Sequence, residues 1–176
     1  MIGTDYRRKV IALHDALGVP ASYRDTTQLE FYEEPLTLAQ TELDFYGREQ
    51  RLTPEALAAW TAMRTQAAKD GVELLLISAF RGIDYQAQLI QRKLDRGQNI
   101  EEILCVNAAP GYSEHHTGRA LDIASKDCPK LEEEFEHTKA FAWLQGNAAN
   151  FGFFMSFPRG NTCGIIYEPW HWCYRA

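Results

Sequence analysis

A single aspartate inside an apolar run limits what this chain can fold into. The run Arg119–Ser125, RALDIAS, is predicted to be a buried β-strand, yet Asp122 puts a carboxylate in its middle. Burying an unpaired carboxylate is costly, so Asp122 needs a hydrogen-bonded partner or a metal ion. The polar turn just before it, Ser113–Gly118, carries two adjacent histidines, His115 and His116. The sequence therefore places a histidine-rich turn beside a strand that contains a charge.

His115 and Asp122 can share a partner only if the chain bends between them. On a straight helix seven residues rise about 10 Å, and on a straight strand residues seven apart face opposite sides. Gly118 lies between the two and can adopt the backbone conformations of a sharp bend. The alternative is that both histidines are ordinary turn residues and that Asp122 pairs locally. This segment alone leaves both interpretations open.

A second group of polar residues lies in the aromatic segment Tyr167–Tyr174, YEPWHWCY. Strand alternation would place His171 and Cys173 on one face and the two tryptophans on the other. The simpler interpretation is an edge strand with one hydrogen-bonded histidine and a cysteine that only packs. Together, however, the two segments offer two histidines, an aspartate and a spare glutamate, Glu168. Catalytic zinc sites use such a set: three protein ligands, an open position for water and a nearby carboxylate.

A third candidate is the segment Ser78–Gln86, SAFRGIDYQ, where a predicted strand ends and a helix begins. Arg81 stands at the end of the strand, and its planar guanidinium can bind a carboxylate through two hydrogen bonds. Gln86 lies about one helical turn further on and can point the same way. The alternative is a surface arginine with a solvated glutamine.

The local patterns predict one α+β domain, with helices first and a small antiparallel sheet towards the C-terminus. Thr53 and Pro54 have the pattern of a helix N-terminus, and Gly71 closes that helix. Further helices are predicted over 5–17, 83–97, 99–107 and 136–149, strands over 29–34, 72–80 and 119–125, and a final strand, loop and β-hairpin over 151–175.

Composition excludes several classes of protein. A chain of 176 residues with 45% hydrophobic residues can bury one sizeable core. Its formal net charge of −6 argues against nucleic-acid binding, and no apolar stretch is long enough for a membrane span. None of the four cysteines forms a CxxC pair, so buried free thiols or disulfides are expected rather than a zinc ribbon.

The N-terminus lacks the charged-then-apolar pattern of a signal peptide. This favours the cytoplasm if Met1 is the native start, and the periplasm or cell wall if an export signal was trimmed.

The three candidate segments, in this order, resemble the VanY-type D-alanyl-D-alanine carboxypeptidases and their L,D-carboxypeptidase relatives among the LAS metallopeptidases. The first signature of that family is S-x-H-x-x-G-x-A-x-D, and the second is E-x-W-H. The fixed positions are filled by Ser113, His115, Gly118, Ala120 and Asp122, and by Glu168, Trp170 and His171; Ser78, Arg81 and Gln86 match an upstream S-x-x-R element followed by glutamine.

The resemblance implies a LAS/hedgehog-like fold and one zinc ion bound by His115, Asp122 and His171. It makes Glu168 the general base that activates a water molecule and later protonates the leaving amine. Arg81 would stabilise the polarised carbonyl or bind the terminal carboxylate of the substrate.

The same resemblance implies that Ser113 and Gln86 help to hold that carboxylate. His116 falls at a position that the family leaves variable. The likeness covers residues 45–176 and leaves 1–44 as an extension of unknown role in a single peptidase domain.

The resulting hypothesis is a monomeric zinc carboxypeptidase that removes the terminal D-alanine from peptidoglycan stem peptides or muropeptides, with D,D or L,D specificity. One alternative is a peptidoglycan endopeptidase of the same superfamily. Others are a non-catalytic zinc-binding interaction module and, because two histidines and a carboxylate also bind iron, a non-haem iron oxygenase.

Overall fold

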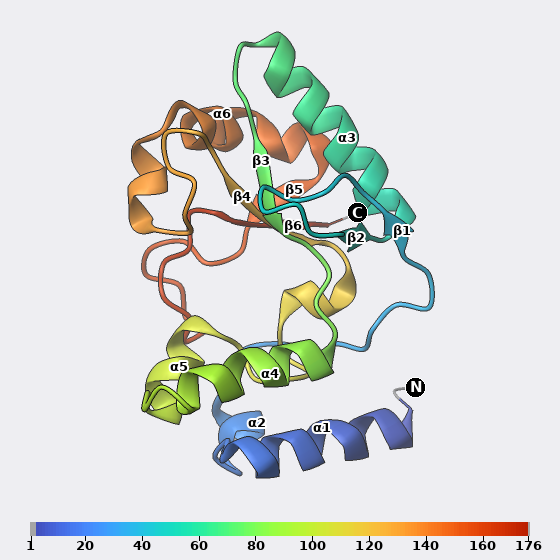
Figure 1. Cartoon of the computed structure of the whole chain (residues 1–176), viewed down its shortest axis with the longest axis vertical. Helices are drawn as coiled ribbons and strands as arrows, with labels where there is room; N and C mark the ends of the chain where they lie inside the picture. Colours follow the sequence, from blue (N-terminus) through green and yellow to red (C-terminus); the bar gives the residue numbers. More distant parts are fainter. Residues whose placement is uncertain (1–2, 176) are drawn as a thin grey trace.

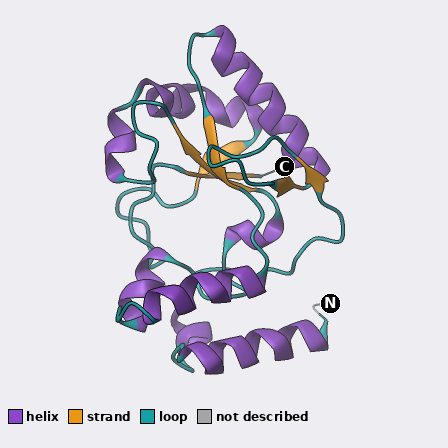
Figure 2. Cartoon of the chain, in the orientation of Figure 1, coloured by secondary structure: helices purple, strands orange, loops and turns teal. Residues whose placement is uncertain are grey.

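The computed structural model describes residues 3–175 and is built around a four-stranded antiparallel sheet (Figures 1 and 2). In the register of the sheet, Asp122 is paired with Ser78 on one side and with His171 on the other. Three of the predicted site segments therefore meet on neighbouring strands. The order across the sheet is β3 (Leu75–Ser78), β4 (Ala120–Ala124), β6 (His171–Tyr174) and β5 (Phe153–Met155).

One face of this sheet is covered by α3 (Pro54–Lys69) and α6 (Lys139–Asn147). Leu121 and Ile123 of β4 and Trp172 of β6 point into the hydrophobic cluster on this side. Since strand neighbours point to opposite faces, Asp122 and His171 lie on the other face. The apolar residues of β4 and β6 thus form the core, while the polar ones are presented together on the opposite side.

A second layer lies below that polar face (Figure 1). Its helices α1, α4 and α5 contribute to a separate hydrophobic cluster that also contains Tyr112, Phe157 and Ile165. The site segments therefore lie between two apolar clusters. The helices of this layer are α1 (Thr4–Leu17), α2 (Tyr23–Thr26), α4 (Ile83–Leu94) and α5 (Ile100–Val106).

Short elements connect these layers. A two-stranded ladder joins β1 (Ala39–Gln40) to β2 (Arg51–Leu52). Three 3₁₀ helices are η1 (Glu114–Thr117), η2 (Glu133–His137) and η3 (Ala148–Phe151).

The α+β prediction is confirmed, and the predicted start of a helix at Thr53 is present, together with a cap at Asn99. The Thr53 side chain accepts a hydrogen bond from the Ala56 backbone N–H, and Asn99 accepts one from Glu101. These bonds satisfy backbone donors that a helix N-terminus otherwise leaves free. Most predicted elements are a few residues longer than the observed ones.

Two predicted elements are wrong. Residues 29–34 form no strand; the Tyr32 backbone N–H instead donates to the Gly111 carbonyl. The C-terminal hairpin is also absent, because β5 and β6 pair with each other across the long connection 156–170. Pro158 and Pro169 interrupt this connection, and a proline has no backbone donor for a ladder.

The N-terminal segment contacts the segments on either side of the site, including the loop that precedes the histidine-containing turn. The ring Nε2 of His14 is 2.7 Å from the Pro110 carbonyl oxygen. The Glu34 carboxylate accepts a 2.7 Å hydrogen bond from the Ile83 backbone N–H at the start of α4. Residues 3–38 therefore contact both the loop before η1 and the helix that follows Arg81.

Gly118 supplies the predicted bend. It ends η1 with φ of +65°, and its carbonyl accepts a hydrogen bond from the Thr53 N–H. A Cβ at this position would lie 2.7 Å from Leu38 Cδ2. Both the backbone conformation and the space around it therefore require glycine.

We expect Gly118→Ala to lower the free energy of unfolding by about 1–3 kcal/mol, since it combines a left-handed alanine with a steric clash. Gly146→Ala is the matched control, because Gly146 lies in α6 with no atom near its Cβ position and should gain up to about 1 kcal/mol. Urea unfolding of both variants measures the difference. Equal stability of the two variants would contradict the conclusion that position 118 requires glycine.

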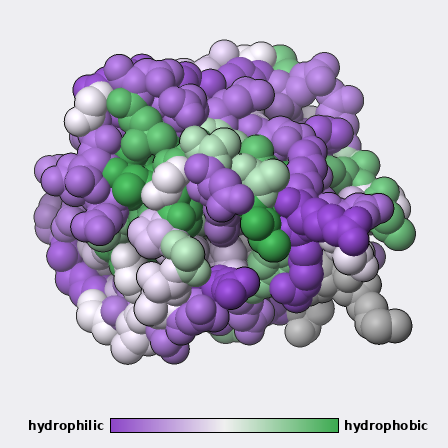
Figure 3. Space-filling model, turned by 90° about the horizontal axis from the view of Figure 1, so that it is seen from below, coloured by the Kyte–Doolittle hydropathy of each residue, from purple (hydrophilic) through white to green (hydrophobic). Residues whose placement is uncertain are grey.

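The four cysteines are free thiols in the structure, and Cys128 and Cys173 are buried. Among the described residues, no helix is long and apolar enough to cross a membrane. Hydrophobic side chains on the face seen from below form an area interrupted by hydrophilic ones (Figure 3).

Candidate functional site

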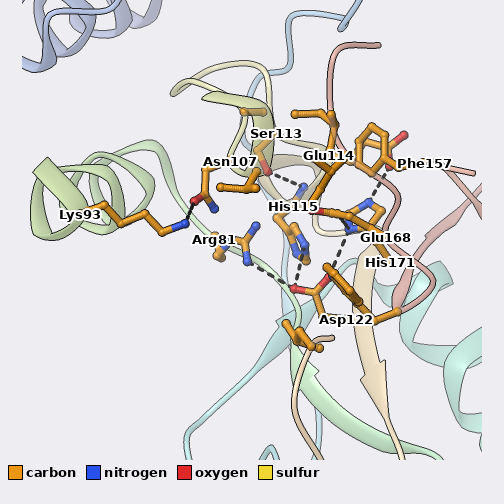
Figure 4. A pocket seen from close by; sticks show the side chains of 16 residues that line it. Arg81, Lys93, Asn107, Ser113, Glu114, His115, Asp122, Phe157, Glu168 and His171 are labelled. Atoms are coloured by element: carbon orange, nitrogen blue, oxygen red, sulfur yellow. Dashed lines mark hydrogen bonds and ion pairs between the residues drawn. The ribbon is translucent and has the colours of Figure 1, made fainter. Parts of the chain in front are cut away.

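His115, Asp122 and His171 converge at the centre of the polar face (Figure 4). One possible ligand atom from each of them lies within 4.8 Å of the others. His115 Nε2 is 3.3 Å from Asp122 Oδ2, and His171 Nδ1 is 3.2 Å from Asp122 Oδ1. All three side chains are buried. The structure thus brings together the three predicted metal ligands from η1, β4 and β6.

The hydrogen bonds of the two histidines fix which ring nitrogen faces the centre. His115 Nδ1 lies 2.6 Å from the Ala79 carbonyl oxygen, which can only accept, so Nδ1 carries the hydrogen. His171 Nε2 is 2.9 Å from Glu114 Oε2. Metal-binding histidines commonly use one nitrogen in this way, which orients the other towards the ion.

The remaining nitrogen of His115 is the clearest indication that the cluster suits a metal ion. Nε2 is buried and makes no hydrogen bond of acceptable geometry in the described part of the chain. Buried polar atoms are nearly always satisfied. Two imidazoles and one carboxylate are also the ligand set of catalytic zinc sites. The residues present therefore fit a single divalent ion.

The pKa values of the two histidines in the cluster are shifted in opposite directions. Burial lowers the pKa of His115 to about 4. Burial would also lower the pKa of His171, but the hydrogen bonds to Asp122 and Glu114 outweigh it and raise that pKa to about 10. A divalent cation would replace the proton of His171, because a metal-binding histidine is neutral.

Glu168 lies just before β6, with Oε2 3.9 Å from His171 Nδ1. Burial raises the pKa of its carboxyl to about 7, and the nearby charge of Asp122 acts in the same direction. A carboxyl with a pKa near neutrality can both accept and return a proton. Its position beside the three-residue cluster suits that task.

Arg81 borders the cluster on another side. Its Nη1 is 3.4 Å from Asp122 Oδ2 and 3.3 Å from Ser78 Oγ, and its Nε is buried without a hydrogen-bond partner among the described residues. Ser113 also lines the cavity, and its hydroxyl accepts a hydrogen bond from the His115 backbone N–H.

Gln86 lies outside this cavity. Its side chain is fully buried, and its amide Nε2 donates a 2.9 Å hydrogen bond to the Ala108 carbonyl. It thus supports the backbone of a segment that lines the site. Its part in substrate binding stays a prediction.

Glu114 lies in the site as well, although the sequence did not mark it as a site residue. Besides His171, its Oε2 contacts the hydroxyl of Ser156. Burial raises its pKa, but the hydrogen bond to His171, the charge of His171 and the hydrogen bond from Ser156 together outweigh burial and lower that pKa to about 2, so Glu114 is ionised. No spacing rule marks this residue, because its contact with His171 depends on how η1 lies against β6.

The cavity above the cluster has a volume of about 330 Å³. Lys93, Asn107 and Phe157 also line it, and none of them was predicted as a site residue. They come from α4, from the residue after α5 and from the loop after β5. The cavity is therefore enclosed by segments of both layers.

His116 faces away from the cluster and has a distinct position. Its Nε2 accepts a hydrogen bond from the Gly111 N–H at 3.1 Å, so Nδ1 carries the hydrogen. That Nδ1–H donates to the Arg81 carbonyl at 2.5 Å. The ring thus joins the backbone of Arg81 to the loop before η1.

Comparisons with known proteins decide the family. A family model described as VanY, D-alanyl-D-alanine carboxypeptidase, matches residues 49–176. The chain belongs to the VanY family. Its predicted membership, based on the two signatures and the upstream element that contains Arg81, is thereby confirmed.

Curated relatives of this VanY-family chain are similar to it over two thirds or more of its length. A D-alanyl-D-alanine carboxypeptidase of Enterococcus faecium is 34% identical over 124 residues, 68% of this chain and 36% of that protein. YodJ of Bacillus subtilis (strain 168) is 33% identical over 141 residues, 77% of this chain and 51% of YodJ. The chain thus spans about half or less of these curated relatives.

A solved structure extends the similarity to the fold. The LdcB LD-carboxypeptidase is 32% identical, with a TM-score of 0.71, covering 80% of this chain and 69% of the other. The VanY-family chain therefore has relatives named for D-Ala-D-Ala and for LD substrates.

Proposed function

We propose that this protein is a zinc-dependent carboxypeptidase that removes the terminal D-alanine from peptidoglycan stem peptides or muropeptides. The observation that carries the proposal is the buried, unpartnered Nε2 of His115 facing Asp122 and His171, with Glu168 beside them. Family membership supports the same reaction. The three clustered residues would hold the ion, and the other site residues would bind the peptide and take part in its hydrolysis.

When bound, zinc lowers the pKa of a water ligand towards about 7 and polarises a carbonyl group. Glu168 then takes the proton of the attacking water and returns it to the leaving amine. Arg81 stabilises the negative charge that develops on the scissile carbonyl oxygen, because its Nη1 reaches the edge of the cluster and its Nε is unpaired. Ser113 assists in holding the carboxylate of the substrate, and Gln86 does so indirectly, by fixing the Ala108 backbone at the cavity wall.

The proposal also covers the organisation of the chain. Residues 45–176 form the catalytic core, and residues 1–44 are an extension within the same peptidase domain. The contacts of His14 and Glu34 with the site loops support a role of this extension in holding the site together. We expect the protein to act as a monomer, since His115, Asp122 and His171 already converge with Glu168 beside them without a second copy.

Release of D-alanine tests the reaction directly. Zinc-loaded protein is incubated with a pentapeptide that ends in D-Ala-D-Ala and with a tetrapeptide that ends in one D-alanine, each with and without a chelator. Chelator-sensitive release from the first indicates D,D specificity, and release from the second indicates L,D specificity. Release from neither peptide would refute the proposal.

A peptidoglycan endopeptidase is the second candidate, because the same zinc chemistry cuts internal bonds. Two cations at the cavity, Arg81 and Lys93, favour the carboxypeptidase, which must accept a free carboxylate. Amidated and cross-linked peptides separate the two. Cleavage of these at the rate of the free acid would favour the endopeptidase.

We expect the bond from His116 to Arg81 to matter for turnover. Asparagine can place an N–H near the position of Nδ1, whereas glutamine can place an acceptor only near Nε2. His116→Asn should therefore keep kcat/KM within about twofold, while His116→Gln lowers it about tenfold, the equivalent of one buried hydrogen bond. Each variant loses one of the two hydrogen bonds that the His116 ring makes, so the melting temperatures of the two variants should be similar. Equal kcat/KM for the two would show that the contact with Arg81 is not needed.

A further inference from the structure

The charges around the cavity are divided between two sides (Figure 4). Glu114, Glu168 and His171 lie together on one side, and Lys93 reaches in from α4 on the side of Arg81. A substrate group with a negative charge would therefore be drawn towards Lys93 and Arg81. The two cations, however, have different neighbours.

Arg81 is already engaged with Asp122, whereas Lys93 has no acidic partner. In the described part of the chain, no carboxylate lies within ion-pair distance of Lys93, and the more distant charge of Glu168 only partly offsets the effect of burial on its pKa. Its ammonium instead donates a hydrogen bond to the side-chain oxygen of Asn107. Lys93 is half-buried, and burial lowers its pKa. A partly desolvated ammonium with a neutral partner gains from an incoming anion.

Asn107 completes a receptor for such an anion. Its side-chain oxygen is occupied by Lys93, and its amide NH₂ makes no hydrogen bond with any described residue. The amide N–H groups and the free N–H groups of the ammonium are therefore available at the cavity wall. Together they match the two oxygens of a carboxylate.

We propose that Lys93 and Asn107 bind a carboxylate of the substrate, either the C-terminal one or one on a side chain. This inference rests on the proposed peptidase function and adds a specificity site to it. It leaves Arg81 free to act on the scissile carbonyl. It also makes a negatively charged peptide the preferred substrate of a protein whose own net charge is negative.

The test compares the binding of four D-alanine-terminated peptides, with a free or amidated C-terminus and with a glutamate or glutamine side chain one residue before the scissile bond. Dissociation constants are measured by calorimetry in zinc-loaded Glu168→Gln protein, so that turnover is not required. Lys93→Met in this background should weaken binding about 10- to 100-fold, but only for peptides that carry the recognised carboxylate. Loss confined to the free C-terminus identifies the terminal carboxylate, and loss confined to glutamate identifies the side chain.

Two further variants separate binding from folding. Lys93→Arg keeps the positive charge and should restore most of the affinity. Arg92→Met removes a neighbouring exposed charge, whose guanidinium lies over the Tyr85 ring, and should have no effect. An equal loss of affinity for all four peptides in Lys93→Met would overturn the proposal. Carboxylate-dependent binding without any hydrolysis by the wild type would refute the peptidase function. The carboxylate site at Lys93 and Asn107 would still be supported by that result.

Discussion

Glu168→Gln is expected to leave zinc bound and the fold unchanged, and to lower kcat by about 10²- to 10⁴-fold, the usual contribution of a general acid–base group. Glutamine has nearly the same shape but cannot take a proton from the attacking water. It also leaves the cluster of His115, Asp122 and His171 intact. The rate of D-alanine release and the zinc content of the same preparation check both parts of this result.

Glu49→Gln is the control, because Glu49 is exposed and does not line the cavity. It should release D-alanine at the wild-type rate. Near-wild-type turnover of the Glu168 variant, with zinc present, would show that another group handles the proton.

His171→Ala is expected to lose stoichiometric zinc and with it nearly all activity. The substitution removes one of three ligands and leaves the carboxylates of Asp122 and Glu114 buried without their shared partner. Metal analysis after dialysis is the measurement, and circular dichroism reports whether the chain still folds.

His137→Ala serves as the matched control for histidine removal, since His137 is exposed on η2. It should retain one zinc per chain. If the His171 variant also retained one zinc per chain, the ligand assignment would be wrong.

The centre of the site could be predicted because it follows local rules. A charge in an apolar strand needs a partner, and a glycine between His115 and Asp122 permits the bend; both features are present in the structure. The partner of Asp122 on the neighbouring strand is His171, as the two signatures together suggested. The opposite orientation of Trp172 also follows from strand alternation.

The rest of the site depends on tertiary packing and left no local pattern. Glu114 reaches His171 only because η1 lies against β6, and Lys93 meets Asn107 only because α4 packs beside the end of α5. The segment 29–34 looked like a strand, but its backbone bonds to the loop at Gly111 instead of a ladder. Such contacts join residues far apart in the sequence, where composition and spacing carry no information.

The pairing of β4 with β6 has a consequence for how this protein can diverge. A slip of one residue between these strands would put a tryptophan where His171 stands and would expose the apolar face at the same time. A register slip would therefore disrupt both the three-residue cluster and the core at once. The wall at Lys93 and Asn107 has no such double role, so new substrates can be selected by substitutions there while the chemistry below stays the same.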